Sequence, residues 1–345
     1  MAEQPRSGFP LGQPGTDSPV LQTALRTRTR TTPVGGFPGM GTAASPPPSS
    51  RPAAAPTAGL ATAPHKKSPS KKSGDTWWER VRFEVTDAVT SGALSERLIR
   101  ASSAVEAPIT TGRRIVVLGT AGGAATTTVA SLLAKLMGSI RQEPVMAVDA
   151  TDHSGNLLRC LGASQAAPLT TLMRQFRTQP VRTLPDAVKN AASCGNQVFA
   201  AGRPDVPAFA DAPLGLQEWT DVSSTLSRFM AVTIVDGGAS PLSRHAAALL
   251  ETAHAVVLVS PPGSVEAAKL ASIQGSLAET FPDVHQVPVV VRSRQNHEAA
   301  SSDGVLSYDR HLASSSGLQL RKLGSRTRIA ATELTGKALM AANRA

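Results

Sequence analysis

The segment from Arg114 to Leu136, RIVVLGTAGGAATTTVASLLAKL, constrains the fold of this 345-residue chain more than any other. We expect the β-branched run from Ile115 to Leu118 to form a buried strand, which leads through a glycine-rich turn into an apolar helix. A strand, a glycine turn and a helix in this order supply the backbone N–H groups and the helix N-terminus that bind a phosphate. The turn glycines are Gly119, Gly122 and Gly123.

The turn lacks the charged residue that a phosphate loop normally carries. In the pattern G-x-x-x-x-G-K-[ST], the lysine reaches the phosphates and the hydroxyl residue binds Mg²⁺. Here Ala125 stands at the second glycine, Thr126 at the lysine and Thr127 at the hydroxyl residue. The pattern therefore predicts a nucleotide site in outline, without its cation. The candidate binding residues are Gly119, Gly122, Gly123, Thr126, Thr127 and Thr128.

Residues 1–74 are rich in Pro, Ser, Ala and Gly and hold half of the 26 prolines. They carry nine basic and two acidic residues, which is +7 of the formal net charge of +10. Such a segment buries too little apolar surface to offset its ordering entropy, so we expect a disordered tail. Its cluster His65–Lys72 has two interpretations: a solubilising linker, or a contact with anionic lipid or nucleic acid.

Residues 75–107 are expected to contain a helix that carries a tryptophan pair. Trp78, Val81, Val85 and Val89 recur at helical spacing, and Thr76 is placed to cap the helix start. The helix docks either on its own domain or on a partner.

Residues 108–345 are expected to form one domain, in which apolar β-branched runs alternate with amphipathic helical stretches. This alternation predicts an α/β fold with a mostly parallel sheet and helices on both faces. The expected strands are 115–118, 145–148, 197–200, 232–235, 256–259 and 287–291, with the first and fourth at the centre. The expected helices are 127–140, 169–175, 216–229, 243–253, 265–281 and 328–341.

Two acidic turns follow expected strands. Asp149 ends one apolar run, and Asp236 ends another and precedes Gly237 and Gly238. Because the carboxyl ends of parallel strands meet at one edge of a sheet, we expect both carboxylates to face the same pocket as the 119–127 turn. An aspartate at a strand end is also a common helix cap, so each one alone says little.

These turns resemble those of the MinD/ParA group of P-loop ATPases, and within it an actinobacterial subgroup associated with type VII secretion. The group's loop reads K-G-G-V-G-K-T-T. Its first lysine falls at Ala121, its third glycine at Ala125 and its second lysine at Thr126. Its acidic turn matches residues 149–157, and its Walker B turn matches residues 235–240.

The C-terminal region adds to the resemblance. Residues 307–328 resemble the subgroup's PYD-x-HL motif, which leads into the last helix, with Ser307 in place of the proline. The asparagine with which the group reads adenine is replaced by Arg292 and Ser293. The likeness covers about residues 75–342.

The resemblance implies ATP and Mg²⁺ as cofactors. It assigns Asp149 and Asp236 as catalytic carboxylates and Thr127 and Asp236 as magnesium ligands. The missing lysines imply a pseudo-ATPase, a regulatory or interaction component of the secretion machinery, with homodimers as a further possibility. The alternative is an active ATPase in secretion or in positioning, with a cation supplied by Arg113, Arg114 or a partner chain. A third hypothesis is a partitioning factor that binds DNA through its folded domain.

Two cysteines without metal-ligand spacing fit a reducing compartment. No apolar run reaches the about 18 residues that a membrane span needs, and the N-terminus lacks an apolar signal core. We therefore expect a cytoplasmic protein, at the inner face of the membrane if the basic tail binds lipid.

Overall fold

The computed structural model describes residues 92–151, 156–163, 167–202, 215–293, 304–312 and 317–345. The disordered tail expected over residues 1–74 lies outside the described residues, as does the tryptophan-bearing start of the helix at Trp78.

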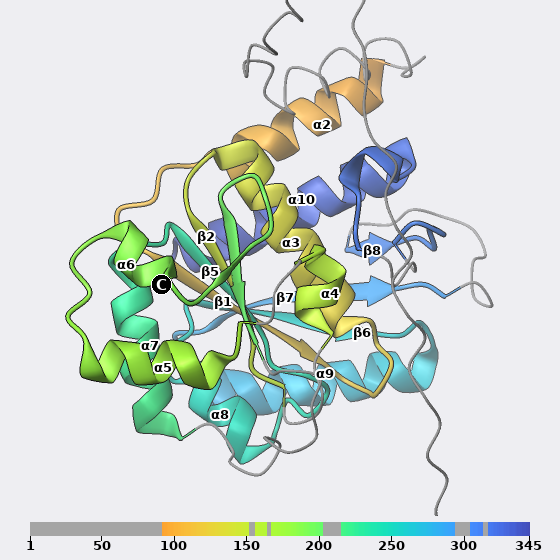
Figure 1. Cartoon of the computed structure of the whole chain (residues 1–345). Helices are drawn as coiled ribbons and strands as arrows, with labels where there is room; N and C mark the ends of the chain where they lie inside the picture. The colour runs from red at the N-terminus through yellow and green to blue at the C-terminus, as the bar shows by residue number, and fades with distance from the viewer. Residues whose placement is uncertain (1–91, 152–155, 164–166, 203–214, 294–303, 313–316) are drawn as a thin grey trace, which may run out of the picture. The chain divides into compact units, whose positions relative to one another are not determined.

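An eight-stranded sheet forms the centre of the described part, in the order β3-β4-β2-β5-β1-β6-β7-β8 (Figure 1). All neighbouring strands run parallel except β3 and β4. The two strands expected at the centre, β1 and β5, lie there. The strands are β1 (Arg113–Gly119), β2 (Val145–Asp149), β3 (Ala192–Ser193), β4 (Val198–Ala201), β5 (Val232–Asp236), β6 (Ala255–Ser260), β7 (His285–Val291) and β8 (Val305–Leu306).

Helices cover both faces of this sheet, and side chains along β1 alternate between the two cores. Ile115 and Val117 pack against α3 and α10, whereas Val116 and Leu118 pack against the helices of the opposite face. Burial on both faces explains the uninterrupted apolar run of this strand. The helices are α2 (Gly92–Val105), α3 (Thr126–Arg141), α4 (Leu157–Leu161), α5 (Leu169–Thr178), α6 (Leu184–Val188), α7 (Leu216–Ser227), α8 (Arg244–Leu250), α9 (Ser264–Thr280) and α10 (Ser325–Ala342), with a short 3-10 helix η3 (Leu320–Lys322).

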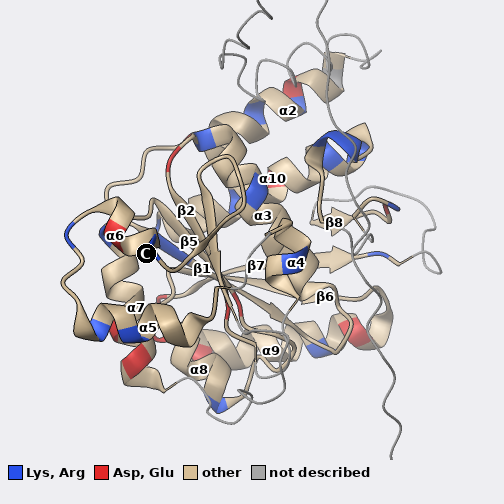
Figure 2. Ribbon diagram, in the orientation of Figure 1, with Lys and Arg blue, Asp and Glu red and all other residues tan. Residues whose placement is uncertain are grey.

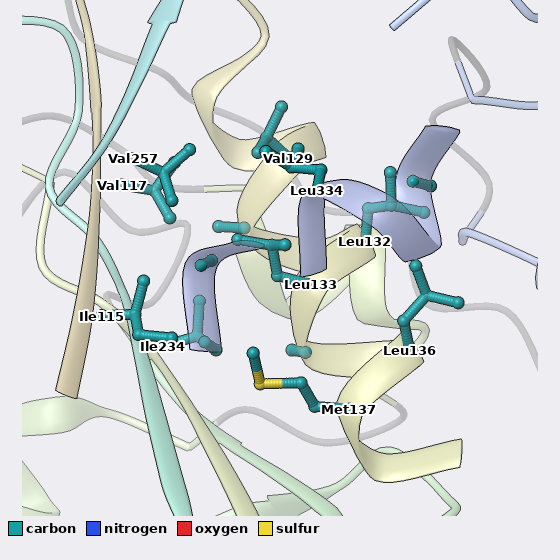
Figure 3. Close-up of a cluster of buried hydrophobic side chains, with 14 of the residues drawn as sticks. Ile115, Val117, Val129, Leu132, Leu133, Leu136, Met137, Ile234, Val257 and Leu334 are labelled. Carbon is teal, nitrogen blue, oxygen red and sulfur yellow. The ribbon is translucent and has the colours of Figure 1, made fainter. Parts of the chain in front are cut away.

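Figure 3 shows the core between α3 and the sheet. Leu133 and Met137 of α3 lie over the sheet residues Ile115 and Ile234, and Leu334 of α10 lies beside Val129. This packing fixes α3, and with it the turn from which α3 begins, against the two central strands.

Helix α2 packs along α10. The two backbones approach closely at Gly336, where an added Cβ would lie 2.8 Å from the Cβ of Ala104. Arg97 donates two hydrogen bonds of 2.8 Å to the carboxylate of Glu333. The described end of the expected 75–107 helical segment is therefore helical and attached to the domain.

Every strand and helix expected from residue 115 onward is present, with ends displaced by three residues or fewer. The sequence did not predict α4, α6, β3, β8 or η3. Each of these has five residues or fewer, which is too short for a hydrophobic period to show. Among the described helices, none is long and apolar enough to cross a membrane.

Candidate functional site

The three turns singled out in the sequence meet at the carboxyl edge of β1, β2 and β5, and main-chain hydrogen bonds join them. Gly119 N donates to Gly238 O at 2.8 Å, and Ala150 N donates to Asp236 O at 2.9 Å. Gly237 N donates to Val117 O at 3.0 Å. The expected convergence of Asp149, Asp236 and the 119–127 turn is therefore present in the structure.

The loop between β1 and α3 keeps the backbone shape of a glycine turn although it has lost one glycine. Gly123 has φ 77°, and Ala125 has φ 71° and ψ 30°, a left-handed conformation that L-residues other than glycine rarely adopt. Gly122 and Gly123 are exposed, and a Cβ added at Gly122 would meet nothing within 4 Å. Packing inside the protein therefore does not explain why Gly122 is a glycine.

Thr126 stands where the resemblance places the lysine, and its side chain turns inward. It is 7% exposed, and its Oγ1 lies so close to Gly119 that a Cβ there would clash. Thr127 and Thr128 are half-buried in the first turn of α3, which has no side-chain cap. A helix N-terminus without a cap leaves backbone N–H groups for an anion.

Asp236 is fully buried at the end of β5. Its Oδ1 accepts a 3.2 Å hydrogen bond from Gly238 N, while its Oδ2 has no partner of hydrogen-bonding geometry within the described chain. Burial, and next the neighbouring Asp149 carboxylate, raise the pKa of Asp236 to about 7, against the opposing effects of the Thr127 hydroxyl and the Gly238 amide. Half of the molecules thus carry a proton on Asp236 near neutral pH.

Asp149 lies beside Asp236 and is equally buried, but its oxygens already serve the protein. Oδ1 accepts from the backbone N and the hydroxyl of Thr151, at 3.2 and 2.7 Å. Oδ2 accepts from Leu157 N, the first residue of α4, at 3.2 Å. Asp149 therefore fixes the acidic turn and the start of α4, which is the helix-capping role that the sequence left open.

Four neighbours of the carboxylates were not expected from the sequence. His245 Nε2 contacts the carbonyl oxygen of Ala150. Burial raises the pKa of the Cys160 thiol, while Ser131 and Arg159 act against that rise and the two aspartates add to it. Arg159 is exposed on α4, so its guanidinium is the cation that the structure brings closest to the cysteine side of the site.

The cations suggested by the sequence for an active site, Arg113 and Arg114, lie elsewhere. Both begin β1, roughly 20 Å from its carboxyl edge at the usual rise of a strand. Arg113 donates to Asn343 Oδ1, and Arg114 donates to Thr252 O and Ser227 Oγ. The expectation that they assist the loop is wrong, because β1 separates them from the loop by its full length.

The donor atoms at the site suit Mg²⁺ better than they suit a triphosphate. Thr127 hydroxyl and the unpartnered Asp236 Oδ2 are hard oxygen ligands of the kind that Mg²⁺ takes together with water and phosphate. The described residues contain no cluster of three or more His, Cys, Asp or Glu for a metal. No cation of the described chain is among the groups that shift the pKa of Asp236. A polyanion here would face two carboxylates with only backbone N–H groups to offset them.

The position expected to read adenine follows β7. Arg292 N donates to Leu306 O at 2.9 Å, so this residue continues the pairing with β8, and Ser293 is exposed. Neither residue offers the paired amide donor and acceptor with which an asparagine recognises adenine.

The C-terminal motif has a clear structural role. Asp309 accepts hydrogen bonds from His311 N at 2.8 Å and from Gly324 N, just before α10, at 2.9 Å. Burial raises the pKa of Asp309, but its bonds with Gly324, His311, Thr327 and Leu312 outweigh that effect and lower it. The motif therefore ties the β8 region to the start of α10.

No family model matches the chain. It is 27% identical over 165 residues to the ESX-1 secretion-associated protein EspI of Mycobacterium tuberculosis. The match covers 46% of this chain and 23% of that protein, so the chain spans about a quarter of the length of the curated relative.

Solved structures show the fold. A ParA family ATPase from Chlorobium tepidum superposes with a TM-score of 0.52 at 15% identity, over 66% of this chain and 98% of that one. The cell division ATPase MinD of Pyrococcus furiosus gives 0.51 at 18% identity, over 66% and 98%. The Mg-ADP complex of the septum site-determining protein MinD from Pyrococcus horikoshii gives 0.51 at 16% identity, over 65% and 94%. The described domain thus has the fold of the MinD/ParA P-loop ATPases.

Proposed function

We propose that this chain, which has the MinD/ParA P-loop fold, acts by binding partners in ESX-type (type VII) secretion and has weak or no nucleotide binding. The observation that carries the proposal is the loop itself. Ala121, Ala125 and Thr126 replace Lys, Gly and Lys, and Thr126 packs inward against Gly119. The chain keeps the sheet, the turn and the carboxylates, and lacks the charges that hold and cleave a triphosphate.

The size of the loss supports this assignment. A charge-assisted hydrogen bond to phosphate contributes about 1.5–3 kcal/mol, so its loss weakens nucleotide binding roughly 10- to 150-fold. Removing a group that stabilises only the transition state raises the barrier by about 3–4 kcal/mol. The buried carboxylates make the loss more severe, because the phosphate charge meets them without a compensating cation.

The secretion assignment rests on EspI, which is described as an ESX-1 secretion-associated protein. The matched portion is limited, so the role of this chain in secretion is part of the proposal. We infer that it works in the cytoplasm, with proteins of the secretion machinery as its partners.

The direct test is nucleotide binding by the full chain. We expect no saturation by a fluorescent ATP analogue with Mg²⁺ in the micromolar range, and no phosphate release above that of a heat-denatured sample. The matched variant is Asp236→Ala, which leaves the loop in place and removes the carboxylate. Phosphate release that Asp236→Ala abolishes contradicts the proposal.

The second candidate is an active ATPase with an altered loop, which is favoured by Thr127 and the unpartnered Asp236 Oδ2. It predicts saturable binding that needs Mg²⁺ and that Thr127→Val removes. Thr127→Ser, which keeps the hydroxyl, serves as the control. No binding at millimolar nucleotide excludes this candidate.

A further inference from the structure

A groove of about 720 Å³ opens between α2, α10, β7 and β8, away from the three turns. Its lining includes apolar side chains from all four elements, among them Leu94, Val289, Leu306 and Ile329. Met340, also part of the lining, is 45% exposed, which is unusual for a large apolar side chain on a helix that packs against the sheet. The groove therefore presents apolar surface to solvent.

The rim of the groove is basic. Arg326, Lys337 and Arg344 of its lining are exposed. Arg97 and Glu333 also line it, but they neutralise each other through their two hydrogen bonds. The charge that remains favours an acidic, amphipathic occupant. Figure 2 shows the basic residues on α10 and α2 at this side of the domain.

We propose that this groove binds residues 75–91 of the same chain as an amphipathic helix. These residues directly precede α2, and Leu94, near the start of α2, lines the groove. They contain four acidic and two basic residues, which complements the rim. Their apolar residues Trp78, Val81, Val85 and Val89 recur at helical spacing.

A helix suits the groove better than an added strand. The strand β8 pairs only with Val290 and Val291, so the preceding part of β7 is an open edge. Pro288 lies in that part and lines the groove, and a proline lacks the N–H that a further strand needs. Laying an apolar helix face into an apolar groove needs no such donor.

Attachment to α2 gives the segment an advantage over any free partner. A ligand joined to its site by a short chain has an effective concentration on the order of millimolar. A partner protein at micromolar concentration must displace it, so the segment regulates access to the groove.

Charge reversal in the full chain tests this. In Arg326→Glu/Arg344→Glu, and in Trp78→Ser/Val81→Ser, we expect hydrogen–deuterium exchange to speed up in β8 and in the second half of α10. Tryptophan emission should shift to the red and become easier to quench with acrylamide. The control Arg174→Glu/Lys189→Glu reverses two exposed charges on α5 and just after α6, and should change neither signal.

A rescue separates docking from damage to the fold. Glu79→Lys/Glu84→Lys, added to Arg326→Glu/Arg344→Glu, restores charge complementarity and should restore protection. Unchanged exchange in both groove and segment variants, or a failed rescue with intact circular dichroism, overturns the proposal. Protection that grows with protein concentration also overturns it, because a second copy would then be the occupant.

Discussion

Asp149 and Asp236 lie at the same register position on the adjacent parallel strands β2 and β5, and both are fully buried. Their carboxylates oppose each other's ionisation, and the described residues bring no cation to Asp236. The pair is therefore the most strained electrostatic feature of the domain, and it makes stability depend on pH.

Asp236→Asn is expected to stabilise the protein at pH 8 and to have little effect at pH 4. A carboxyl whose pKa rises on folding, from about 3.9 to about 7, binds more protons in the folded state than in the unfolded one. The free energy of unfolding therefore falls as the pH rises through that window, by on the order of 2–4 kcal/mol for this group. Urea denaturation at the two pH values measures the effect.

The control is Asp283→Asn, an exposed aspartate on the turn before β7. An equal gain from Asp236→Asn at both pH values would show that the effect is not due to ionisation.

Ala125→Gly is expected to raise the free energy of unfolding by about 0.5–1 kcal/mol. Glycine adopts the left-handed conformation of residue 125 without the steric penalty that alanine has there. Ala124→Gly is the matched control, since Ala124 is buried and is not among the residues with positive φ. That change should destabilise the protein. A loss of stability in Ala125→Gly would contradict the geometry of the loop.

Ala125→Gly/Thr126→Lys is expected to tighten binding of an ATP analogue roughly 10- to 150-fold, because it restores one charge-assisted contact. The control Ala125→Gly/Thr126→Met has a side chain of similar length without the charge. Isothermal titration with Mg²⁺ and the analogue gives the affinities. If both variants bind alike, the lysine is not what the loop lacks.

Gly122→Ala is expected to leave stability unchanged, whereas Gly237→Ala should lower it by about 1–3 kcal/mol. A Cβ at Gly237 would lie 2.7 Å from Leu118 Cδ2 and 3.0 Å from Leu249 Cδ1, while Gly122 has open space. Thermal melting compares the two variants. Because Gly122→Ala costs the fold nothing, any change it causes in partner or nucleotide binding reports on a ligand at the loop.

Asp309→Ala is expected to lower stability by about 0.5–2 kcal/mol, the usual range for a lost helix cap. Its folded pKa is lowered, so its contribution is present above the unfolded pKa and disappears as the pH falls through the folded pKa. Wild type and variant should therefore differ at pH 7 and converge in strong acid. The conservative variant Asp309→Asn keeps one acceptor oxygen and should lose less.

The fold was predictable because its strands are buried on both faces and its longer helices are amphipathic, so the periods change clearly along the chain. The convergence of Asp149, Asp236 and the loop was also predictable, since parallel strands end at one edge. The proximity of Cys160 and Arg159 was not, because α4 is only five residues long and its packing depends on tertiary contacts. Arg113 and Arg114 misled because nearness in sequence ignores the length of a strand.

The hydrogen bonds from Gly119 N to Gly238 O and from Ala150 N to Asp236 O hold the loop by main chain alone. The shape of this edge therefore does not depend on a bound nucleotide. On the function proposed above, the surface offered to partners is permanent and is not renewed by cycles of hydrolysis. We then expect the extent of assembly to follow the amount of protein in the cell, independent of its energy supply.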